Sequence, residues 1–182
     1  MRLCGIDEAG RGPIAGDLVI AGVVLNSFVD GLMDSKKLTQ KRREVLYPLI
    51  IANSKYHIVL FNADEVDRLG ISKCISQGLE EIKQNLPNFN YLFDGNSTFG
   101  VSDISTMVKA DTKIAEVSAS SILAKVTHDR EMLKYDIEFP MYGFAKHKGY
   151  GTKAHIEAIR EYGRCRVHRE SFRVKALGER DE

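Results

Sequence analysis

Residues 5–17 read G-I-D-E-A-G-R-G-P-I-A-G-D and begin after only four residues of chain. An apolar lead-in runs into two adjacent acids, Asp7 and Glu8, and then into a loop with a glycine on each side of an arginine. We predict a strand over residues 2–7 that ends at these acids. Successive residues of a regular strand point to opposite faces, so the two carboxylates share one site only if the pleat is interrupted. The glycines that follow favour such an interruption.

The composition is that of an ordinary globular protein. Of its 182 residues, 43% are hydrophobic and 28% are charged, which predicts one domain with a substantial core. We find no apolar run of ~18 residues and no basic segment leading into an apolar stretch. We therefore expect no membrane span and no secretory signal, and we expect the protein to be cytoplasmic. Three widely spaced cysteines without a C-x-x-C pair indicate buried thiols in a reducing compartment.

The charge is unevenly distributed along the chain. The formal net charge is only +1, but residues 143–175 contain nine Lys or Arg against three Glu. We therefore expect a basic helical extension over about residues 140–182 of a single domain, 1–182. A basic face beside carboxylates is typical of an enzyme that holds a phosphate backbone and uses divalent metal. We expect Arg160, Arg164 and Arg169 to contribute to salt-dependent binding of such a backbone.

Periodicity predicts a mixed arrangement of strands and helices. Apolar, β-branched runs predict strands over residues 2–7, 17–25, 56–61, 91–93 and 104–108. Helical spacing predicts helices after an N-cap at Thr39, over residues 63–85, from Thr112 to Pro140, and after an N-cap at Thr152, with a loop over 143–151. Strands that first follow one another and later alternate with helices predict one mixed α/β sheet with helices on its faces.

Acidic residues recur where predicted strands end. Asp7 and Glu8, Asp94, and Asp111 each stand at such a point. Ligands and catalytic groups of open α/β sheets gather beyond strand ends, so these acids are expected to converge. Four carboxylates in one pocket repel one another unless cations neutralise them, and an all-oxygen site favours Mg²⁺ or Mn²⁺. Two such ions would activate a water and stabilise the leaving oxygen of a phosphodiester. Any one of these acids taken alone is more typical of a turn or cap.

Seven ordered blocks recur along nearly the whole chain. They are G-I-D-E-A-G-R-G-P (5–13), D-S-K-K-L (34–38), F-D-G-N (93–96), K-A-D (109–111), S-S-I-L-A-K-V (120–126), H-K-G-Y-G-T (147–152) and H-R-E-S-F (168–172). In this order and at this spacing they resemble the type II ribonuclease H (RNase HII) family. The resemblance implies a ribonuclease H-like fold, with a five-stranded mixed sheet flanked by helices and a small helical C-terminal region.

The family resemblance implies an activity. Such enzymes cleave the RNA strand of RNA–DNA hybrids and cut on the 5′ side of a single ribonucleotide in duplex DNA, leaving a 3′-hydroxyl and a 5′-phosphate. By matching motif, the catalytic and metal-binding residues are Asp7, Glu8, Asp94 and Asp111, with two Mn²⁺ or Mg²⁺ ions. The expected partners are RNA–DNA hybrids and ribonucleotide-containing duplex DNA. No obligate protein partner and no membrane are expected, and the protein is expected to be a monomer.

The same resemblance assigns substrate-binding residues. Gly10, Arg11 and Gly12 match the block that senses the ribonucleotide 2′-hydroxyl, largely through main-chain groups, and glycine lets a backbone approach a ligand closely. Tyr150 matches the tyrosine that stacks on the sugar of the following nucleotide. Lys36 is expected to contact phosphate, although a solvated lysine is an equal alternative.

Other positions carry open or weaker interpretations. Ser121 and Lys125 share a helix face and are either at the core edge or in contact with phosphate. The family arginine before Asp129 is replaced by His128, which would make a phosphate or acid contact pH-dependent near neutrality. His147 and His155 match no common zinc spacing. His168 and Arg169 either brace the C-terminal helix or contact phosphate, and the sequence leaves this choice open.

Two other functions compete with this one. A ribonuclease H-fold exonuclease or resolvase also uses carboxylates at strand ends, but the G-R-G-P and H-K-G-Y-G-T blocks argue against it. A non-catalytic nucleic-acid-binding module is expected to lack at least one of the four acids, and all four are present.

Overall fold

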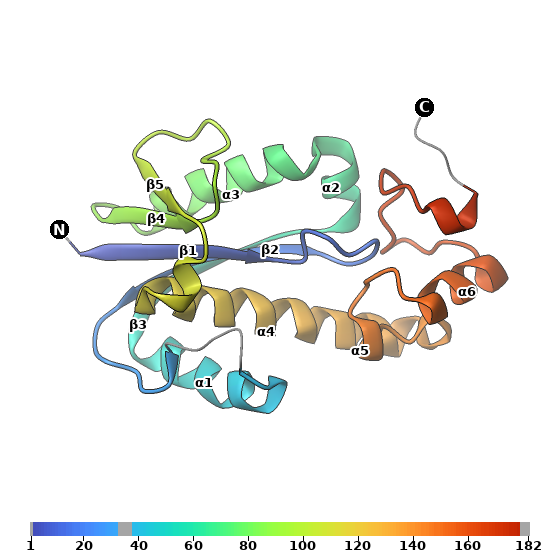
Figure 1. The fold of residues 1–182 in the computed structure, drawn as a ribbon, viewed down its shortest axis with the longest axis horizontal. Helices are drawn as coiled ribbons and strands as arrows, with labels where there is room; N and C mark the ends of the chain where they lie inside the picture. Colours follow the sequence, from blue (N-terminus) through green and yellow to red (C-terminus); the bar gives the residue numbers. More distant parts are fainter. Residues whose placement is uncertain (1, 33–37, 179–182) are drawn as a thin grey trace.

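Five strands form one mixed sheet in the computed structural model, which describes residues 2–32 and 38–178 (Figure 1). The strand order is β3-β2-β1-β4-β5, with β2 antiparallel to both β1 and β3, and β4 parallel to both β1 and β5. The expected five-stranded mixed sheet is confirmed. The strands are β1 (Leu3–Ala9), β2 (Leu18–Leu25), β3 (Ser54–Phe61), β4 (Asn90–Asp94) and β5 (Ile104–Met107).

Helices cover both faces of this sheet. In Figure 1, α2 and α3 lie on one side and α1 and α4 on the other, while α5 and α6 gather beyond one end of the sheet. Short 3₁₀ helices lie between these elements and after the last of them. The helices are α1 (Gln40–Ala52), α2 (Ala63–Leu69), α3 (Ile71–Asn85), α4 (Ala115–Glu138), α5 (Phe144–His147) and α6 (Lys153–Tyr162), with η2 (Ala110–Thr112), η3 (Pro140–Tyr142) and η4 (Lys175–Leu177).

The central strand β2 explains why both faces are covered. Leu18 and Ile20 point into the cluster beneath α2 and α3, whereas Val19 and Ala21 point into the cluster beneath α1 and α4. A strand buried on both faces is apolar at every position rather than at alternate ones. The nearly continuous apolar run in the sequence is therefore a sign of its central place.

The close packing of β1 on α4 depends on Gly5. A Cβ added at this residue would lie 2.3 Å from the backbone of Glu116 and Val117. Such a distance is inside van der Waals contact, so no other residue fits without moving the helix. This close approach brings the start of α4, and η2 before it, next to β1.

The observed boundaries correct several predictions. The helix expected over residues 63–85 is two helices, because Gly70 takes a positive φ of 79° between α2 and α3. The loop expected over residues 143–151 contains α5, and α4 begins at Ala115 rather than at Thr112. The N-caps at Thr39 and Thr152 are confirmed, since each side chain accepts a backbone N–H of its helix.

The first strand is longer than predicted. It runs to Ala9, so Asp7 and Glu8 lie within β1 and pair with Ala21 and Ile20 of β2. The predicted interruption of the pleat at these acids is therefore wrong. The chain turns only at Gly10, which has a φ of 83°.

The C-terminal region packs on the end of α4 and on the loop after β1. A third apolar cluster joins Ile14 and Met132 to Phe144, Ile159 and Val167. Within residues 2–32 and 38–178, no helix is both long enough and apolar enough to cross a membrane.

Candidate active site

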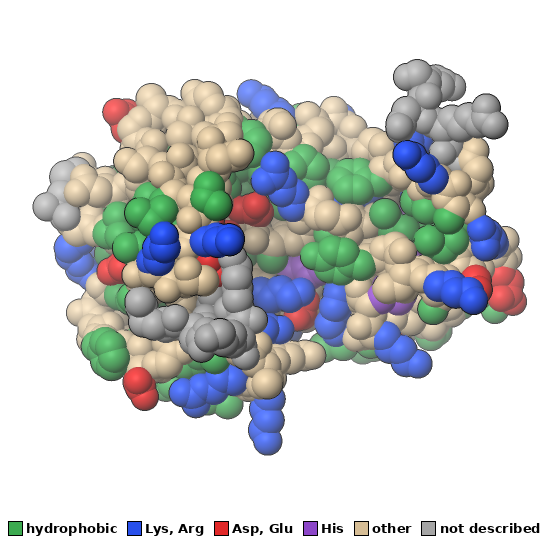
Figure 2. Space-filling model, viewed as in Figure 1, with side chains coloured by type: hydrophobic (Ala, Val, Ile, Leu, Met, Phe, Trp, Pro, Cys, Tyr) green, Lys and Arg blue, Asp and Glu red, His purple; other side chains and the backbone are tan. Residues whose placement is uncertain are grey.

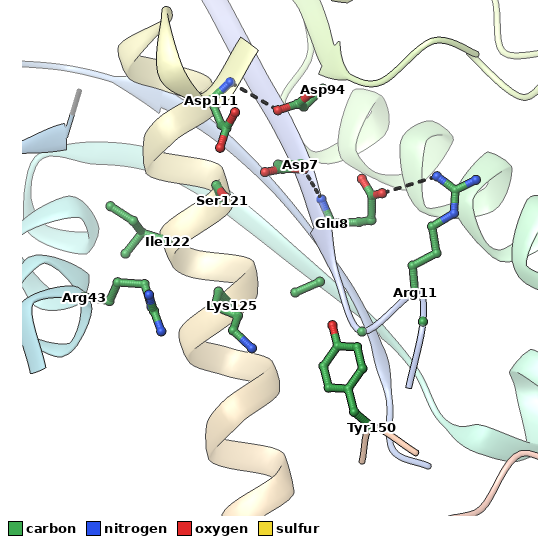
Figure 3. A pocket seen from close by; sticks show the side chains of 13 residues that line it. Asp7, Glu8, Arg11, Arg43, Asp94, Asp111, Ser121, Ile122, Lys125 and Tyr150 are labelled. Atoms are coloured by element: carbon green, nitrogen blue, oxygen red, sulfur yellow. Dashed lines mark hydrogen bonds and ion pairs between the residues drawn. The ribbon is translucent and has the colours of Figure 1, made fainter. Parts of the chain in front are cut away.

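One pocket brings together most of the predicted site residues. Its lining comes from β1 and the loop after it, from β4, η2, α4 and α1, and from the loop before α6 (Figure 3). Ser121 and Lys125 also line it, which places both at the pocket rather than in the core. The lining residues are Asp7, Glu8, Ala9, Gly10, Arg11, Gly12, Arg43, Asp94, Asp111, Ser121, Ile122, Lys125 and Tyr150.

The two acids of β1 leave the strand in different directions and still face the same pocket. In Figure 3, Asp7 points toward Ser121 of α4, whereas Glu8 points toward Arg11. The Oδ1 atom of Asp7 accepts the Glu8 N–H at 2.8 Å, and the Arg11 guanidinium lies 3.6 Å from Glu8. The Oε2 atom of Glu8 is buried without a hydrogen-bond partner among the described residues.

Asp94 and Asp111 are joined through the backbone. The carboxylate of Asp94, the last residue of β4, accepts the N–H of Lys109 at 2.9 Å and the N–H of Asp111 at 3.2 Å. Lys109 is in the left-handed region, with φ 59°. Asp94 thereby holds the turn that brings Asp111, which is fully buried in η2, beside it.

The local environment disfavours charge on three of these acids. Burial raises the pKa of Asp7, and the negative charges of Glu8 and Asp94 raise it further. Burial also raises the pKa of Glu8, against the opposing charge of Arg11, and raises the pKa of Asp94. Bound cations would remove this penalty, because they neutralise the mutual repulsion.

The donor set fits a hard divalent cation. Carboxylate oxygens are the ligands that Mg²⁺ and Mn²⁺ prefer. The buried Oε2 atom of Glu8 accepts no hydrogen bond from any described residue. Within the described ranges, no three acidic, His or Cys side chains already form a metal cage. The carboxylates therefore line one pocket, but their oxygens are not arranged at ligand distance from a single ion position.

The G-R-G block forms the wall of the pocket next to Glu8. A Cβ on Gly10 would lie 2.2 Å from the Asp17 carbonyl oxygen and 2.6 Å from the ring of His128, so this position requires glycine. At Gly12 the nearest atom, in the Tyr150 ring, would be 3.6 Å away. Space alone therefore does not require glycine at Gly12.

Tyr150 stands across the pocket from the carboxylates (Figure 3). Its side chain is 46% exposed, so the ring is available to a ligand. The Gly149 carbonyl before it accepts the N–H of Ile14 at 2.9 Å. The tyrosine loop is thus bonded directly to the loop after β1.

His128 does not meet a phosphate. The side chain is 1% exposed, and its Nδ1 lies 3.3 Å from the carboxylate of Asp129, which also accepts from Lys125 at 2.9 Å. The expected contact with an acid is therefore present, whereas access to a substrate is not. Lys36 lies outside the described residues.

The basic stretch over residues 143–175 forms a cationic surface only in part. Arg169 is fully buried and donates to backbone carbonyls, so its predicted contact with a phosphate backbone is wrong. Arg166 is paired with Glu138 and Lys153 with Glu157. In Figure 2, acidic side chains appear in the middle of the viewed face with Lys and Arg side chains around them.

Neither the place of Arg43 at the site nor the partners of Arg169 were predicted from the sequence. Arg43 of α1 lines the pocket, but in the sequence it is one of several basic residues of a helix with no distinguishing neighbour. Arg169 was noticed within its block, yet its partners are carbonyl groups that no sequence pattern marks.

Comparisons with known proteins agree with this geometry. The family model described as Ribonuclease HII matches residues 4–175. A Ribonuclease HII of Sulfurovum sp. (strain NBC37-1) is 68% identical over 177 residues, covering 97% of this chain and 94% of the relative.

Solved structures show the same likeness. The RNase HII in a structure of the PCNA:RNase HII complex from Archaeoglobus fulgidus superposes with a TM-score of 0.81 at 27% identity, covering 96% of each chain. The ribonuclease H2 from Pyrococcus horikoshii OT3 gives a TM-score of 0.78 at 28% identity, covering 94% of each chain. The chain therefore belongs to the ribonuclease HII family.

Proposed function

We propose that this ribonuclease H, besides hydrolysing RNA in RNA–DNA hybrids, cuts duplex DNA on the 5′ side of a single embedded ribonucleotide. The products would carry a 3′-hydroxyl and a 5′-phosphate. We further propose that Asp7, Glu8, Asp94 and Asp111 hold two divalent ions, Mg²⁺ or Mn²⁺, for this reaction. We propose the same site for both substrates, within a single domain over residues 1–182.

One observation carries this proposal: the four carboxylates and the G-R-G block line the same pocket. Recognition of a 2′-hydroxyl and hydrolysis of the neighbouring phosphodiester require the two functions to lie within one nucleotide of each other. Since Glu8 and Gly10 are two residues apart at the end of β1, the strand itself sets this short separation.

The side chains around the pocket supply complementary roles. Arg43 and Lys125 offer positive charge at the side of α4, where a phosphate of the cut strand would lie, and Tyr150 offers a partly exposed ring for a sugar. Gly10, Arg11 and Gly12 would contact the 2′-hydroxyl, which is both donor and acceptor. Bound Mg²⁺ or Mn²⁺ would lower the pKa of water and neutralise charge that develops on the phosphate.

A general nuclease with the same carboxylates is the competing function. Such a nuclease would not need a backbone loop beside the acids, nor an exposed tyrosine next to Gly149, whose carbonyl accepts from Ile14 of that loop. A binding module that lacks catalysis would not need three partly buried acids with raised pKa values in one pocket. We therefore favour the ribonucleotide-directed endonuclease, acting as a monomer without an obligate protein partner.

The decisive experiment uses a labelled DNA duplex with one ribonucleotide, incubated with purified protein and Mg²⁺ or Mn²⁺. An all-DNA duplex of the same sequence and an Asp94→Asn variant serve as controls. We expect one cut 5′ to the ribonucleotide, absent from both controls. Cutting of both duplexes would favour the general nuclease. A folded, metal-bound protein that cuts neither this duplex nor an RNA–DNA hybrid would contradict the proposal.

A further inference from the structure

Arg169 is a fully buried cation that faces the inner side of the loop after β1. Its Nε atom donates to the Gly16 carbonyl at 3.0 Å, and its Nη1 atom donates to the Pro13 carbonyl at 2.9 Å. Its Nη2 atom donates to the Gly10 carbonyl at 2.6 Å, and a longer contact of 3.4 Å joins Nη1 to the Arg11 carbonyl. One side chain therefore gathers the carbonyl groups along residues 10–16.

The burial of this guanidinium is compensated by the loop. Burial lowers the pKa of Arg169 to about 10, while the charges of Asp17 and Asp67 act in the opposite direction. Its guanidinium donates to the backbone carbonyls of Gly10, Arg11, Pro13 and Gly16, and the ring of Phe172 lies 5.0 Å away. A buried charge is tolerated only when such partners satisfy it, so the loop conformation and the buried arginine depend on each other.

The direction of these carbonyls fixes the direction of the amides that follow them. In a trans peptide the C=O and the next N–H point opposite ways, and the described chain has no cis peptide. The Gly10 and Arg11 carbonyls point to Arg169, so the N–H groups of Arg11 and Gly12 point away from it. Both of these residues line the pocket.

We propose that Arg169 is a positioning residue for ribonucleotide recognition, which turns the peptide groups of residues 10–12 so that their N–H groups face the 2′-hydroxyl. This inference rests on the proposed function. Arg169 does not touch the substrate, because it is fully buried behind the loop. It acts by selecting the one loop conformation that presents these amides before substrate arrives, which is preorganisation.

His168, the residue before Arg169, supports the opposite wall of the pocket through His155. His155 donates from Nδ1 to the Tyr150 carbonyl at 2.9 Å, since a carbonyl only accepts, and its Nε2 therefore accepts from Nε2 of His168 at 3.0 Å. Burial lowers the pKa of both histidines to about 4, in keeping with this neutral pair. His168 is thus linked to the tyrosine loop through His155, and Arg169 is bonded directly to the G-R-G loop.

The test compares the affinities of two duplexes that differ by one 2′-hydroxyl. Each protein carries Asp94→Asn to keep the duplex intact, and fluorescence anisotropy gives the ratio of the two dissociation constants. The test variants are Arg169→Met, which keeps much of the length without charge or donors, and Arg169→Lys, which keeps the charge but not the planar fork. The matched control is Ile159→Ala, which truncates the apolar cluster of the same region without removing a hydrogen bond.

We expect the preference for the ribonucleotide duplex to fall about tenfold in Arg169→Met, since ~1.4 kcal/mol, the size of one hydrogen bond, corresponds to a factor of ten. Arg169→Lys should give an intermediate loss and serves as the test if the methionine variant does not fold. Affinity for the all-DNA duplex should change little. Ile159→Ala should lower the melting temperature and leave the preference intact.

Three outcomes would overturn the inference, and they are distinguishable. If the parent enzyme cuts at the ribonucleotide but folded Arg169 variants keep its preference, Arg169 is only a stabilising residue and the proposed function stands. If the Ile159→Ala control loses the preference equally, the effect follows from stability and the inference fails. If the parent protein neither prefers nor cuts the ribonucleotide duplex, the proposed function fails and the inference fails with it.

Discussion

At the scale of single residues, the pocket concentrates like charges that the fold alone does not neutralise. Asp7, Glu8 and Asp94 each have a raised pKa because burial and neighbouring carboxylates oppose ionisation. Arg11 offsets this for Glu8, but its side chain is half exposed and 3.6 Å away. The metal-free protein is therefore less stable at neutral pH than its packing would allow.

This repulsion predicts that Asp7→Asn stabilises the metal-free protein. The substitution keeps the shape of the side chain and its acceptor for the Glu8 N–H while removing one buried charge. A gain of about 1 kcal/mol would raise the melting temperature by roughly 2–4 °C. The variant should also lose most of the stabilisation that Mn²⁺ gives the parent, because bound ligand stabilises only the state that binds it. Thermal unfolding with and without Mn²⁺ measures both effects.

The pH dependence of that gain has a definite sign. A group whose pKa is raised on folding adds stability below its unfolded pKa, and this stability is lost as pH rises through the folded pKa. The advantage of Asp7→Asn should therefore be greatest at neutral pH and vanish toward about pH 4, the usual pKa of Asp. An advantage that is constant with pH would mean that charge is not its cause. Ser121→Ala should act in the opposite direction and destabilise the protein at neutral pH, because it removes a hydrogen bond that lowers the pKa of Asp7.

The sequence predicted the acidic residues of the site better than its basic residues. Asp7, Glu8, Asp94 and Asp111 were predicted because acids near the ends of apolar runs form a pattern, and the structure brings all four to one pocket. Arg169 was predicted on the surface, since a cation is rarely buried. Its burial depends on carbonyl groups about 155 residues away, and their direction is a property of the folded loop.

At the scale of elements, the contact between β1 and α4 sets the site. Three carboxylates come from β1 and from η2, which directly precedes α4, so the distance between these elements controls how the carboxylates meet. Strand existence was predictable from β-branched runs. The end of β1 was not, because Asp7 and Glu8 read as a strand terminus although β2 continues to pair with them.

The same contact predicts a large cost for Gly5→Ala. The new Cβ would meet backbone atoms of Glu116 and Val117 at 2.3 Å, and backbone cannot rotate away as a side chain can. We expect destabilisation at the upper end of the roughly 1–3 kcal/mol typical of overpacking. Urea unfolding would measure it. Gly151→Ala is the matched control, since its Cβ would meet Ile14 at an ordinary 3.6 Å and should change stability little. Equal losses in both variants would contradict this account.

At the scale of the whole molecule, position in the fold decides which basic residues can meet a nucleic acid. The local excess of Lys and Arg over residues 143–175 predicted a cationic face. In the structure, Arg169 is buried, and exposed cations of this stretch such as Lys153 do not line the pocket. Lys125 comes from α4, outside that stretch, yet it lines the pocket beside Ser121. The sequence gives the number of charges in a segment, but only the fold shows which surface each side chain lies on.

This distinction predicts how binding responds to salt. Each phosphate contact releases counterions, so removing one cation from the binding path lowers the slope of log K against log salt by about 1. We expect Lys125→Gln to lower the slope by this amount on a ribonucleotide-containing duplex, measured by fluorescence anisotropy in an Asp94→Asn background. Lys153→Gln removes the same charge from α6, where the side chain is 91% exposed and lies 3.8 Å from Glu157.

The two lysine variants separate a local effect from net charge, since both lose one positive charge. If phosphate lies along α4, only Lys125→Gln changes the slope, because Lys153 does not line the pocket. Equal changes would mean that the C-terminal helix is also in the binding path, as the charge pattern of the sequence suggested. An unchanged slope in Lys125→Gln would place the substrate backbone away from α4 and would confine recognition to the wall formed by residues 10–12 and Tyr150.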